Sequence, residues 1–217
     1  DDTNFISTNI AGTHNLLNIC KNFIKDSTLK DNFKFIQVST DEVYGSLDSD
    51  EDAFTESSIL KPTNPYSASK ASADLLCMSY FKTHEFPVLI TRCTNNYGPY
   101  QHPEKLIPLT IYRLNNNKKI PIYGSGNQIR DWIYVEDHCA GILTTLEKGK
   151  IGDVYNFGGN NEIKNKVCVE KIINKIKKGS DSQEHIKHVQ DRPGHDTRYA
   201  IDSSKAKKEL SWEPKIS

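Results

Sequence analysis

The first hundred residues alternate between segments with the apolar spacing of a helix and short segments with the character of strands. Residues 9–25 and 66–83 show the helical spacing, and Pro65 stands where the second helix would begin. Residues 33–38 and 87–91 are short, apolar and rich in aromatic or β-branched side chains. Helices and strands that alternate at these lengths predict a parallel α/β sheet covered by helices.

The rest of the chain has a more mixed pattern. Residues 46–64 are acidic and polar and predict an exposed loop, and residues 95–99 predict a turn. Beyond residue 100 we expect helices over 105–115, 136–147 and 167–178, and extended segments over 120–123, 129–135 and 153–157. These elements are expected to mix additions to the sheet with a smaller lobe.

Charge and cysteine content argue against several functional classes. Lys plus Arg and Asp plus Glu number 28 each, so the net charge of zero does not favour nucleic acid or an anionic membrane as a partner. No segment approaches the ~18 consecutive apolar residues of a membrane span. The 5 cysteines have no C-x-x-C spacing, which argues against a disulfide framework or a zinc site and favours the cytoplasm. We also expect no metal, because the histidines form no cluster with acids or cysteines.

Tyr66 and Lys70 are candidates for a proton-transferring pair. Residues four apart lie on the same face of a helix, and an ammonium beside a phenol lowers the pKa of the phenol from its usual value of about 10. However, one Tyr-x-x-x-Lys is expected by chance in a chain this rich in the two residues, and an exposed ring over a lysine stem is the simpler interpretation. The pair therefore needs support from its surroundings.

Polar side chains follow both predicted strands at their carboxyl ends. Thr40, Asp41 and Glu42 follow the first strand, residues 92–96 follow the second, and the helix of Tyr66 connects the two. Ligands of open parallel sheets bind beyond the carboxyl ends of the strands, so these groups are expected to converge at one edge. Adjacent acids at a strand end usually form a solvated turn, but in this setting they predict a functional site.

Several stretches of the chain resemble one known family. They are STDEVYG, NPYSASKA, RCTNNYGPYQHPEKLIP, PIYGSGNQIRDWIYVEDH, YNFGG and DRPGHDTRYAID. Together they resemble the dTDP-glucose 4,6-dehydratase family, in the nucleotide-sugar branch of the extended short-chain dehydrogenase/reductase superfamily, over essentially all 217 residues. The resemblance implies a Rossmann-like parallel sheet with a smaller mixed α/β substrate-binding lobe. It also implies NAD as cofactor and a nucleoside-diphosphate glucose as substrate, with dTDP-glucose favoured.

The same resemblance implies roles for the residues at the strand ends. Tyr66, as phenolate, would take the proton of the sugar O4 while hydride leaves C4 for NAD, with Thr40 bonded to O4. Lys70 would hold the nicotinamide ribose and lower the pKa of Tyr66. Glu42 would then remove the C5 proton, and protonated Asp41 would donate to the departing C6 hydroxyl. Two adjacent acids suit an elimination because different environments can separate their pKa values.

Further residues match the family's binding motifs. Asn95 would contact the sugar or a phosphate, and Asn96 the cofactor. Arg130 and Arg192 would clamp the diphosphate, as guanidinium groups are suited to do, with His195 near the same end. The nucleotide would be surrounded by Lys105, Leu106, Pro121, Tyr123 and Asn165. Alternatively, Arg130 pairs with a neighbouring aspartate and His195 is an ordinary loop residue.

The resemblance also implies a division of the chain and an incomplete cofactor site. Residues 1–100 would be a partial NAD-binding Rossmann-like domain that carries the catalytic residues. Residues 101–217 would be mainly a nucleotide-sugar-binding lobe, with elements that return to the sheet. The family begins with a Gly-rich strand-turn-helix for the NAD pyrophosphate, and no G-x-G-x-x-G occurs here. We therefore expect a fragment truncated at both ends, not able to bind NAD stably by itself.

Two alternative functions and one partner complete the expectations. Another nucleotide-sugar enzyme, such as a UDP-glucose 4,6-dehydratase, would share most of these motifs, although Asp41 and Glu42 argue against an epimerase. An inactive nucleotide-sugar-binding or dimerisation fragment is the alternative of another class.

Helices 9–25 and 66–83 carry more apolar residues than one sheet face requires, so by analogy with the superfamily we expect a homodimer through these helices.

Overall fold

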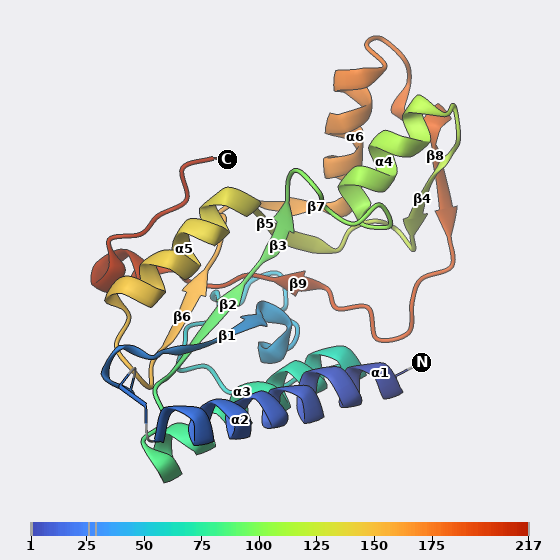
Figure 1. Ribbon diagram of the computed structural model, residues 1–217. Coiled ribbons are helices and arrows are strands. Elements are labelled where there is room, and N and C mark those ends of the chain that lie inside the picture. The colour runs from blue at the N-terminus through green and yellow to red at the C-terminus, as the bar shows by residue number, and fades with distance from the viewer. Residues whose placement is uncertain (1, 26, 29, 217) are drawn as a thin grey trace.

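A parallel sheet forms the centre of the molecule. The computed structural model describes residues 2–25, 27–28 and 30–216. The sheet has the order β1-β2-β6, with β1 at Phe35–Thr40, β2 at Val88–Cys93 and β6 at Val154–Phe157 (Figure 1). β1 and β2 pair in parallel up to Thr40 opposite Cys93, so the two strands end at the same edge. The predicted parallel α/β sheet is confirmed, although β1 and β2 extend two residues further along the chain than expected.

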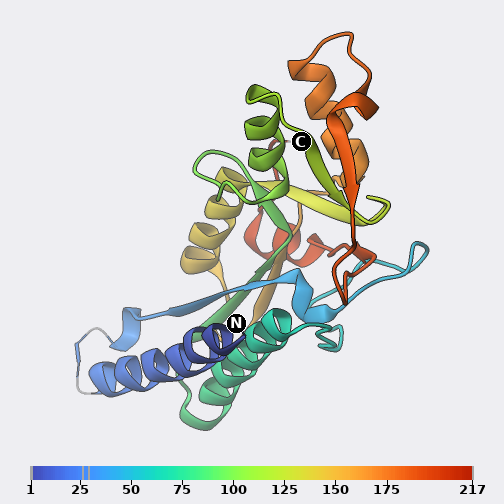
Figure 2. The ribbon, with the colours of Figure 1, turned by 90° about the vertical axis from the view of Figure 1, so that its right-hand side faces the viewer.

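Two long helices lie side by side along one face of this sheet (Figures 1 and 2). The first is built from α1 (Thr3–Phe5), the π-helical η1 (Ile6–Gly12) and α2 (Thr13–Lys25), which follow one another without a break. The second is α3 (Pro65–His84). Leu17 and Ile24 of α2 pack with Cys77 and Tyr80 of α3 and with Val88 of the sheet. Both predicted helices are confirmed, and the first begins earlier than its apolar spacing indicates.

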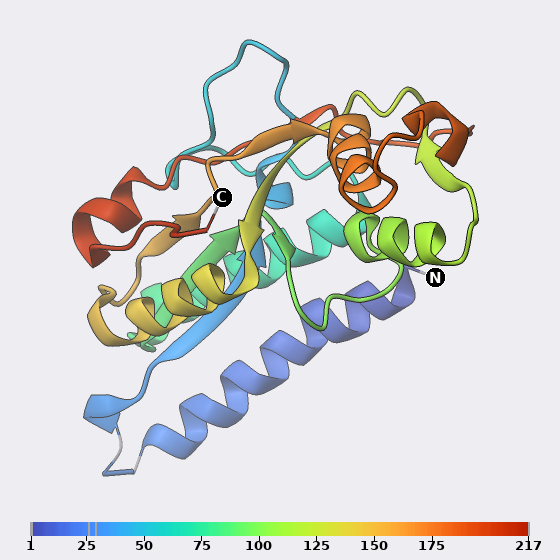
Figure 3. The ribbon, with the colours of Figure 1, turned by 90° about the horizontal axis from the view of Figure 1, so that it is seen from above.

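The opposite face of the sheet is covered by α5 (Val135–Lys148) and by the C-terminal segment with η5 (Ala206–Leu210) (Figure 3). Phe157 of β6 is the centre of this layer: its ring lies 4.6 Å from that of Trp212. Asp137 ties the last described residues to α5, because its carboxylate accepts hydrogen bonds from the backbone of Lys215 and Ile216. Among the described residues, no helix is both long enough and apolar enough to cross a membrane.

A smaller lobe stands at the carboxyl end of the sheet (Figure 1). Helices α4 (Leu106–Asn115) and α6 (Asn165–Ile176) pack there against the parallel pair β4 (Ile120–Tyr123) and β8 (Ile186–Val189). A second sheet joins β3 (Asn95–Tyr97), β5 (Ile129–Tyr134), β7 (Glu162–Lys164) and β9 (Arg198–Tyr199) between the lobe and the central sheet. The remaining short elements are η2 (Lys30–Asn32), η3 (Asp41–Tyr44) and η4 (Ser182–His185).

The structure corrects several sequence expectations. Residues 95–97, expected in a turn, form β3 against β5, and the sequence indicated neither β7, β8 nor β9. These strands are short and polar, so they have no apolar alternation of their own and depend on their partners. The loop 46–64 is mostly exposed, as predicted, but Leu47 is buried and forms a bridge to Arg198, while Phe54 bridges to Ile201.

Gly159 offers a test of how tightly the loop after β6 is packed. A Cβ atom at this position would lie 1.8 Å from the carbonyl oxygen of Trp132. Because the atom it meets belongs to the backbone, the clash could be relieved only by a shift of the backbone. We expect Gly159→Ala to lower the free energy of unfolding by about 1–3 kcal/mol in urea titrations. Gly12→Ala is the matched control, because its Cβ meets nothing closer than 3.6 Å and it should stabilise the helix by about 0.5–1 kcal/mol. A Gly159→Ala variant with an unchanged free energy of unfolding would contradict this close packing.

Candidate active site

The two adjacent acids lie in a tight turn at the end of β1. Thr40 caps this 3-10 turn: its Oγ1 accepts a hydrogen bond from the backbone N–H of Glu42 at 3.3 Å and donates to Asp41 Oδ1 at 3.1 Å. Gly45 ends the turn with φ at 95°, where a Cβ would lie 2.4 Å from the carbonyl oxygen of Lys61. In a continued strand the two acids would point to opposite faces, and the turn removes that alternation.

Asp41 is buried in a way that keeps it protonated. Its side chain is 3% exposed, and burial, followed by the charge of Glu42, raises its pKa from 3.8 to about 8. Asp41 Oδ2 is buried and has no hydrogen-bond partner among the described residues. At neutral pH this carboxyl is therefore mainly an acid with a proton to donate.

Glu42 has a different environment from its neighbour. Burial raises its pKa, but a hydrogen bond from Asn64 and the charges of Arg130 and Lys105 act in the opposite direction. Asn64 is also the N-cap of α3, where its Oδ1 accepts a hydrogen bond from the backbone N–H of Ser67 at 2.9 Å. The amide of Asn64 and the charges of Arg130 and Lys105 favour the carboxylate form of Glu42, whereas the hydrogen bond from Thr40 and the charge of Arg130 do not offset the burial of Asp41. Burial raises both pKa values; the pKa of about 8 suits Asp41 to the role of the acid, and the amide donor and cations around Glu42 favour it as the base.

Tyr66 and Lys70 lie on α3 beside this turn, but their interaction differs from the one expected. Burial raises the pKa of Tyr66 to about 12, and the charges of Glu42, Cys93 and Asp41 act in the same direction. Lys70 Nζ donates a hydrogen bond to the carbonyl oxygen of Val38 at 2.7 Å, and burial lowers its pKa. The expected lowering of the Tyr66 pKa by Lys70 is therefore not seen in this chain. Burial of the phenol, followed by the charge of Glu42, sets this direction, and the ammonium of Lys70 is directed toward the backbone of β1.

The residues expected on the cofactor side form a hydrogen-bonded group with a histidine that the sequence did not single out. Asn96 Nδ2 donates to the carbonyl oxygen of Thr94 at 3.1 Å, and its Oδ1 lies 2.9 Å from Nδ1 of His138 on α5. Because Asn96 Oδ1 can only accept, Nδ1 of His138 is the protonated nitrogen. Burial lowers the pKa of His138 to about 4, so the ring is neutral. The amide of Asn95 has a buried Oδ1 without a partner among the described residues.

These residues fit one end of a nicotinamide cofactor. Lys70 uses one of its three N–H donors on Val38 and keeps two for a ribose. Asp41 and Asn95 follow the carboxyl ends of β1 and β2, and each has a buried oxygen without a partner among the described residues, which a ligand with a hydrogen-bond donor would satisfy. Asn96, by contrast, is fully engaged within the chain and can contribute mainly by fixing the shape of the loop after β2. The 217 residues contain no Gly-rich motif for a pyrophosphate.

Arg192, His195 and Tyr123 come together near the lobe, as a common nucleotide-binding end requires. His195 Nδ1 lies 2.6 Å from Asp191 Oδ1 and its Nε2 lies 3.1 Å from Arg192 Nη2, while the Arg192 guanidinium lies 5.2 Å from the ring centre of Tyr123. Burial is the main cause that lowers the pKa of His195. The aspartate partner makes His195 part of an organised cluster rather than a solitary loop residue. Arg192 itself is exposed and can reach an anion.

Arg130 is held by backbone carbonyls and not by a neighbouring acid. Its guanidinium donates to the carbonyl oxygens of Ile129 at 2.7 Å and Asp196 at 2.9 Å, and lies 4.3 Å from the ring centre of Tyr199. Among the described residues neither Asp131 nor Asp137 pairs with it, so that alternative is not supported. Arg130 is 6% exposed. A diphosphate would therefore have to replace these carbonyls or bind the guanidinium at its edge.

The remaining predicted nucleotide contacts line the lobe. Lys105 is exposed at the start of α4, where its charge acts on Glu42, and Leu106 packs into the core of the lobe. Pro121 lies in β4 opposite Lys187. Asn165 begins α6, and its backbone N–H donates to the carbonyl oxygen of Gln128 at 2.9 Å.

Two residues at the centre of this region were not singled out from the sequence. Tyr199 and Asp196 hydrogen-bond to each other, and both act electrostatically on the environment of Glu42 and Arg130. Both lie in the stretch DRPGHDTRYAID, which carries part of the family resemblance, so this motif was the feature of the sequence that could have identified them as site residues. Their partners lie in β5 and η3, and only the fold brings these elements together.

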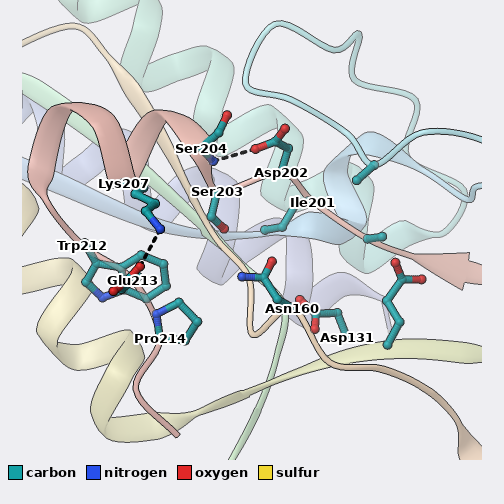
Figure 4. Close-up of a pocket in the computed structure, with 13 residues that line it drawn as sticks. Asp131, Asn160, Ile201, Asp202, Ser203, Ser204, Lys207, Trp212, Glu213 and Pro214 are labelled. Carbon is teal, nitrogen blue, oxygen red and sulfur yellow. Dashed lines mark hydrogen bonds and ion pairs between the residues drawn. The ribbon is translucent and has the colours of Figure 1, made fainter. Parts of the chain in front are cut away.

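A separate cavity of about 560 Å³ is lined by Asp131 of β5, by Asn160 and by residues of the C-terminal segment between Ala200 and Pro214 (Figure 4). Several of its charged groups are paired: Lys207 bonds to Glu213 at 2.8 Å, and Asp202 accepts from the backbone N–H of Ser204 at 2.6 Å. Asp131 at its edge accepts from the backbone of Gly159. Neither Tyr66 nor Glu42 lines this cavity, so it is distinct from the candidate active site.

Comparison with known proteins places the chain in one family. The family described as GDP-mannose 4,6 dehydratase matches residues 2–217. A dTDP-glucose 4,6-dehydratase of Xanthomonas campestris pv. campestris is 48% identical over 97% of this chain and 62% of its own length. The chain thus spans somewhat less than two thirds of this curated relative. These findings confirm the resemblance drawn from the motifs.

Two solved structures share the fold closely. A dTDP-glucose 4,6-dehydratase from Bacillus anthracis in complex with NAD has a TM-score of 0.91 at 48% identity, over 100% of this chain and 66% of that one. A dTDP-glucose 4,6-dehydratase from Streptomyces venezuelae with NAD and TYD bound also has a TM-score of 0.91, at 41% identity over 100% and 64%. The predicted Rossmann-like fold is confirmed.

The raised pKa of Asp41 makes a prediction about stability and pH. The unfolded chain ionises Asp41 near its pKa of 3.8, whereas the folded chain keeps the proton up to about pH 8. The wild type therefore loses stability as the pH rises between these two values. Because an asparagine amide in this place would stay neutral, Asp41→Asn should be more stable than the wild type at pH 8, and this difference should shrink toward pH 4. Denaturant titrations across this pH range measure it, with Asp50→Asn of the exposed loop as the control for losing one acid. A difference that does not change with pH would contradict the burial effect.

Proposed function

We propose that this chain, which belongs to the GDP-mannose 4,6-dehydratase family, is the catalytic part of an NAD-dependent dTDP-glucose 4,6-dehydratase. The observation that carries the proposal is the pair Asp41 and Glu42, held in one turn beside Tyr66 but in different environments. Residues 1–100 would be the partial cofactor-binding part, and residues 101–217 would mainly bind the nucleotide sugar. The free cysteines are consistent with a place in the cytoplasm.

The first step would oxidise the sugar at C4. Tyr66 takes the proton of the O4 hydroxyl, and Thr40, at the end of β1, provides a hydroxyl to orient O4. NAD⁺, when bound, would supply the acceptor for the C4 hydride and a positive ring that favours the phenolate of Tyr66. Tyr66 would then be able to act as a base, which Lys70 alone does not achieve in this chain. Lys70 then has free N–H donors to hold the ribose.

The second step would eliminate water across C5 and C6. A ketone at C4 makes the C5 proton acidic, and Glu42 removes it as the general base. Asp41 still carries its proton at neutral pH, because of its burial, and donates it to the departing C6 hydroxyl. Return of the hydride to C6 would leave an enolate, and the proton held by Glu42 would go back to C5, so that the product is a 4-keto-6-deoxy sugar with no net change in the oxidation state of the cofactor. Asn95, Arg130, Arg192 and His195 would hold the sugar and the diphosphate.

The preference for dTDP-glucose over UDP-glucose is supported by the relatives. The relative from Xanthomonas campestris and the two solved structures are named as dTDP-glucose enzymes. A nucleotide would lie at the lobe, where Tyr123, Arg192 and His195 are grouped. Comparing turnover of dTDP-glucose with that of UDP-glucose measures this preference directly.

Replacing the proposed base tests the reaction. In the polypeptide at its full natural length with NAD⁺, we expect Glu42→Gln to reduce deuterium exchange at C5 by about 10²–10⁴-fold, because general base catalysis typically contributes that much. Glu147→Gln, an exposed glutamate on α5, is the matched control and should retain exchange. If the wild type binds dTDP-glucose without C5 exchange or keto-sugar formation, the chain is a binding module and the enzyme proposal fails.

We further propose a homodimer through the two long helices. On α2 the side chains of Leu16, Ile19 and Phe23 are 55%, 64% and 63% exposed, and Leu75 of α3 is 61% exposed. Leu16, Ile19 and Phe23 follow the spacing of one helix face. Such a stripe on two neighbouring helices is suited to pack against its own copy. Other apolar residues of α3, namely Leu76, Met78 and Phe81, pack instead against the core beside α2.

A charge in this stripe tests the dimer. We expect the wild type to sediment as a dimer and Ile19→Glu to sediment as a monomer with unchanged circular dichroism, since a carboxylate would be buried without a partner. Ile59→Glu, in the exposed loop, is the control and should remain dimeric. A monomeric wild type would contradict the proposed dimer, and a dimeric Ile19→Glu would place the interface elsewhere.

A further inference from the structure

A chain of buried polar side chains runs beneath the candidate active site. Arg92 of β2 donates from Nε to Asp74 Oδ2 at 2.9 Å and from Nη1 to the hydroxyl of Tyr44 at 2.8 Å. The Tyr44 hydroxyl donates in turn to Asn156 Oδ1 at 2.9 Å, and the backbone N–H of Asn156 donates to Glu56 Oε1 at 2.9 Å. Arg92, Asp74, Tyr44 and Asn156 are at most 5% exposed. We call Asp74, Arg92, Tyr44 and Asn156 the buried relay.

The relay crosses the central sheet directly below the catalytic turn. Arg92 pairs in register with Ser39 of β1 on one side and with Asn156 of β6 on the other. Ser39 immediately precedes Thr40, the residue that caps the turn of Asp41 and Glu42. Two members of the relay, Arg92 of β2 and Asn156 of β6, therefore lie on the central sheet, one residue before the level of Thr40 at the proposed site.

Two members of the relay, Asp74 and Tyr44, lie on the two elements that carry the proposed chemistry. Asp74 follows Lys70 by four residues and Tyr66 by eight, so it lies on the same face of α3, and its charge acts on Lys70. Tyr44 is the last residue of the turn that holds Asp41 and Glu42. A single guanidinium thus holds the helix of the phenol and the turn of the acids at once.

Stability alone does not account for this arrangement. Apolar residues of similar volume are often at least as stabilising as a buried ion pair, because of the cost of taking the charges out of water. A guanidinium adds a planar fork whose donors point in set directions. Here Nε and Nη1 bond to two different elements, and the guanidinium lies 4.7 Å from the ring centre of Tyr44. The relay restricts the relative placement of α3 and the turn η3.

We propose that Arg92 is a positioning residue, which holds Glu42 and Asp41 at the distance from Tyr66 that allows oxidation and elimination on one sugar. This inference rests on the proposed function for its chemical consequence. Loss of the bond to Tyr44 frees the turn but leaves α3 attached to Arg92 through Asp74. The elimination step should then suffer more than the oxidation step.

Tyr44→Phe tests this separation, because it removes one hydroxyl and keeps the ring. In the full-length polypeptide with NAD⁺ and dTDP-glucose, we expect C5 deuterium exchange to fall by about 10–10²-fold, as for a small misplacement of a catalytic group. The appearance of reduced nicotinamide should change by less than about twofold, so reduced cofactor should accumulate during turnover. Equal losses in both rates, or no loss in either, would overturn the proposal. Thr91→Val, a buried neighbour of Arg92 outside the relay, is the control and should leave the two rates in their wild-type ratio.

A second measurement does not depend on the reaction. Tyr44→Phe and Asp74→Asn should be non-additive in denaturant unfolding, with the double variant losing clearly less stability than the sum of the two single variants, because both changes act through Arg92. Additive losses would overturn the relay even if the enzyme is active. If instead the wild type shows no C5 exchange while the losses are non-additive, the proposed function fails and the relay itself stands.

Discussion

The burial of two adjacent carboxyl groups at the end of β1 is the constraint around which the site is built. Burying one acid is unfavourable unless it is protonated or balanced by donors and cations, and burying two side by side adds their repulsion. The structure uses both solutions, since Asp41 keeps its proton while Glu42 receives an amide donor and nearby positive charge. The chemical difference between the two acids is thus a direct consequence of where each is placed.

The elements around the turn are coupled to it through shared side chains. Asn64 caps the helix that carries Tyr66 and also lowers the pKa of Glu42, so the start of α3 and the base are linked by one amide. Arg92 links the same helix to the turn from below. A change in either residue alters the relation between phenol and acids, which explains why a site of few residues depends on a large buried network.

Most of the central sheet and its helices could be predicted because their side chains repeat with the period of the element. Leu17 and Ile24 have helical spacing, and Val88 to Cys93 is buried along its whole length. Strands β7, β8 and β9 could not be predicted in this way. They are short, partly polar and defined by pairing with residues far away in the chain, such as Arg198 with Ile129. The same holds for Tyr199 and Asp196, whose relation to Glu42 and Arg130 depends on those pairings.

The sequence alone determined which reactive groups the chain has and that they gather at one sheet edge, because parallel strands joined by a helix end on the same side. It named Asp41, Glu42, Tyr66 and Lys70 through their motifs. Only the tertiary structure decided their protonation and partners: Asp41 remains protonated, and Lys70 is directed to Val38 instead of lowering the pKa of Tyr66. The physical reason is that burial and the charges of distant residues set a pKa, and neither quantity exists until the chain has folded.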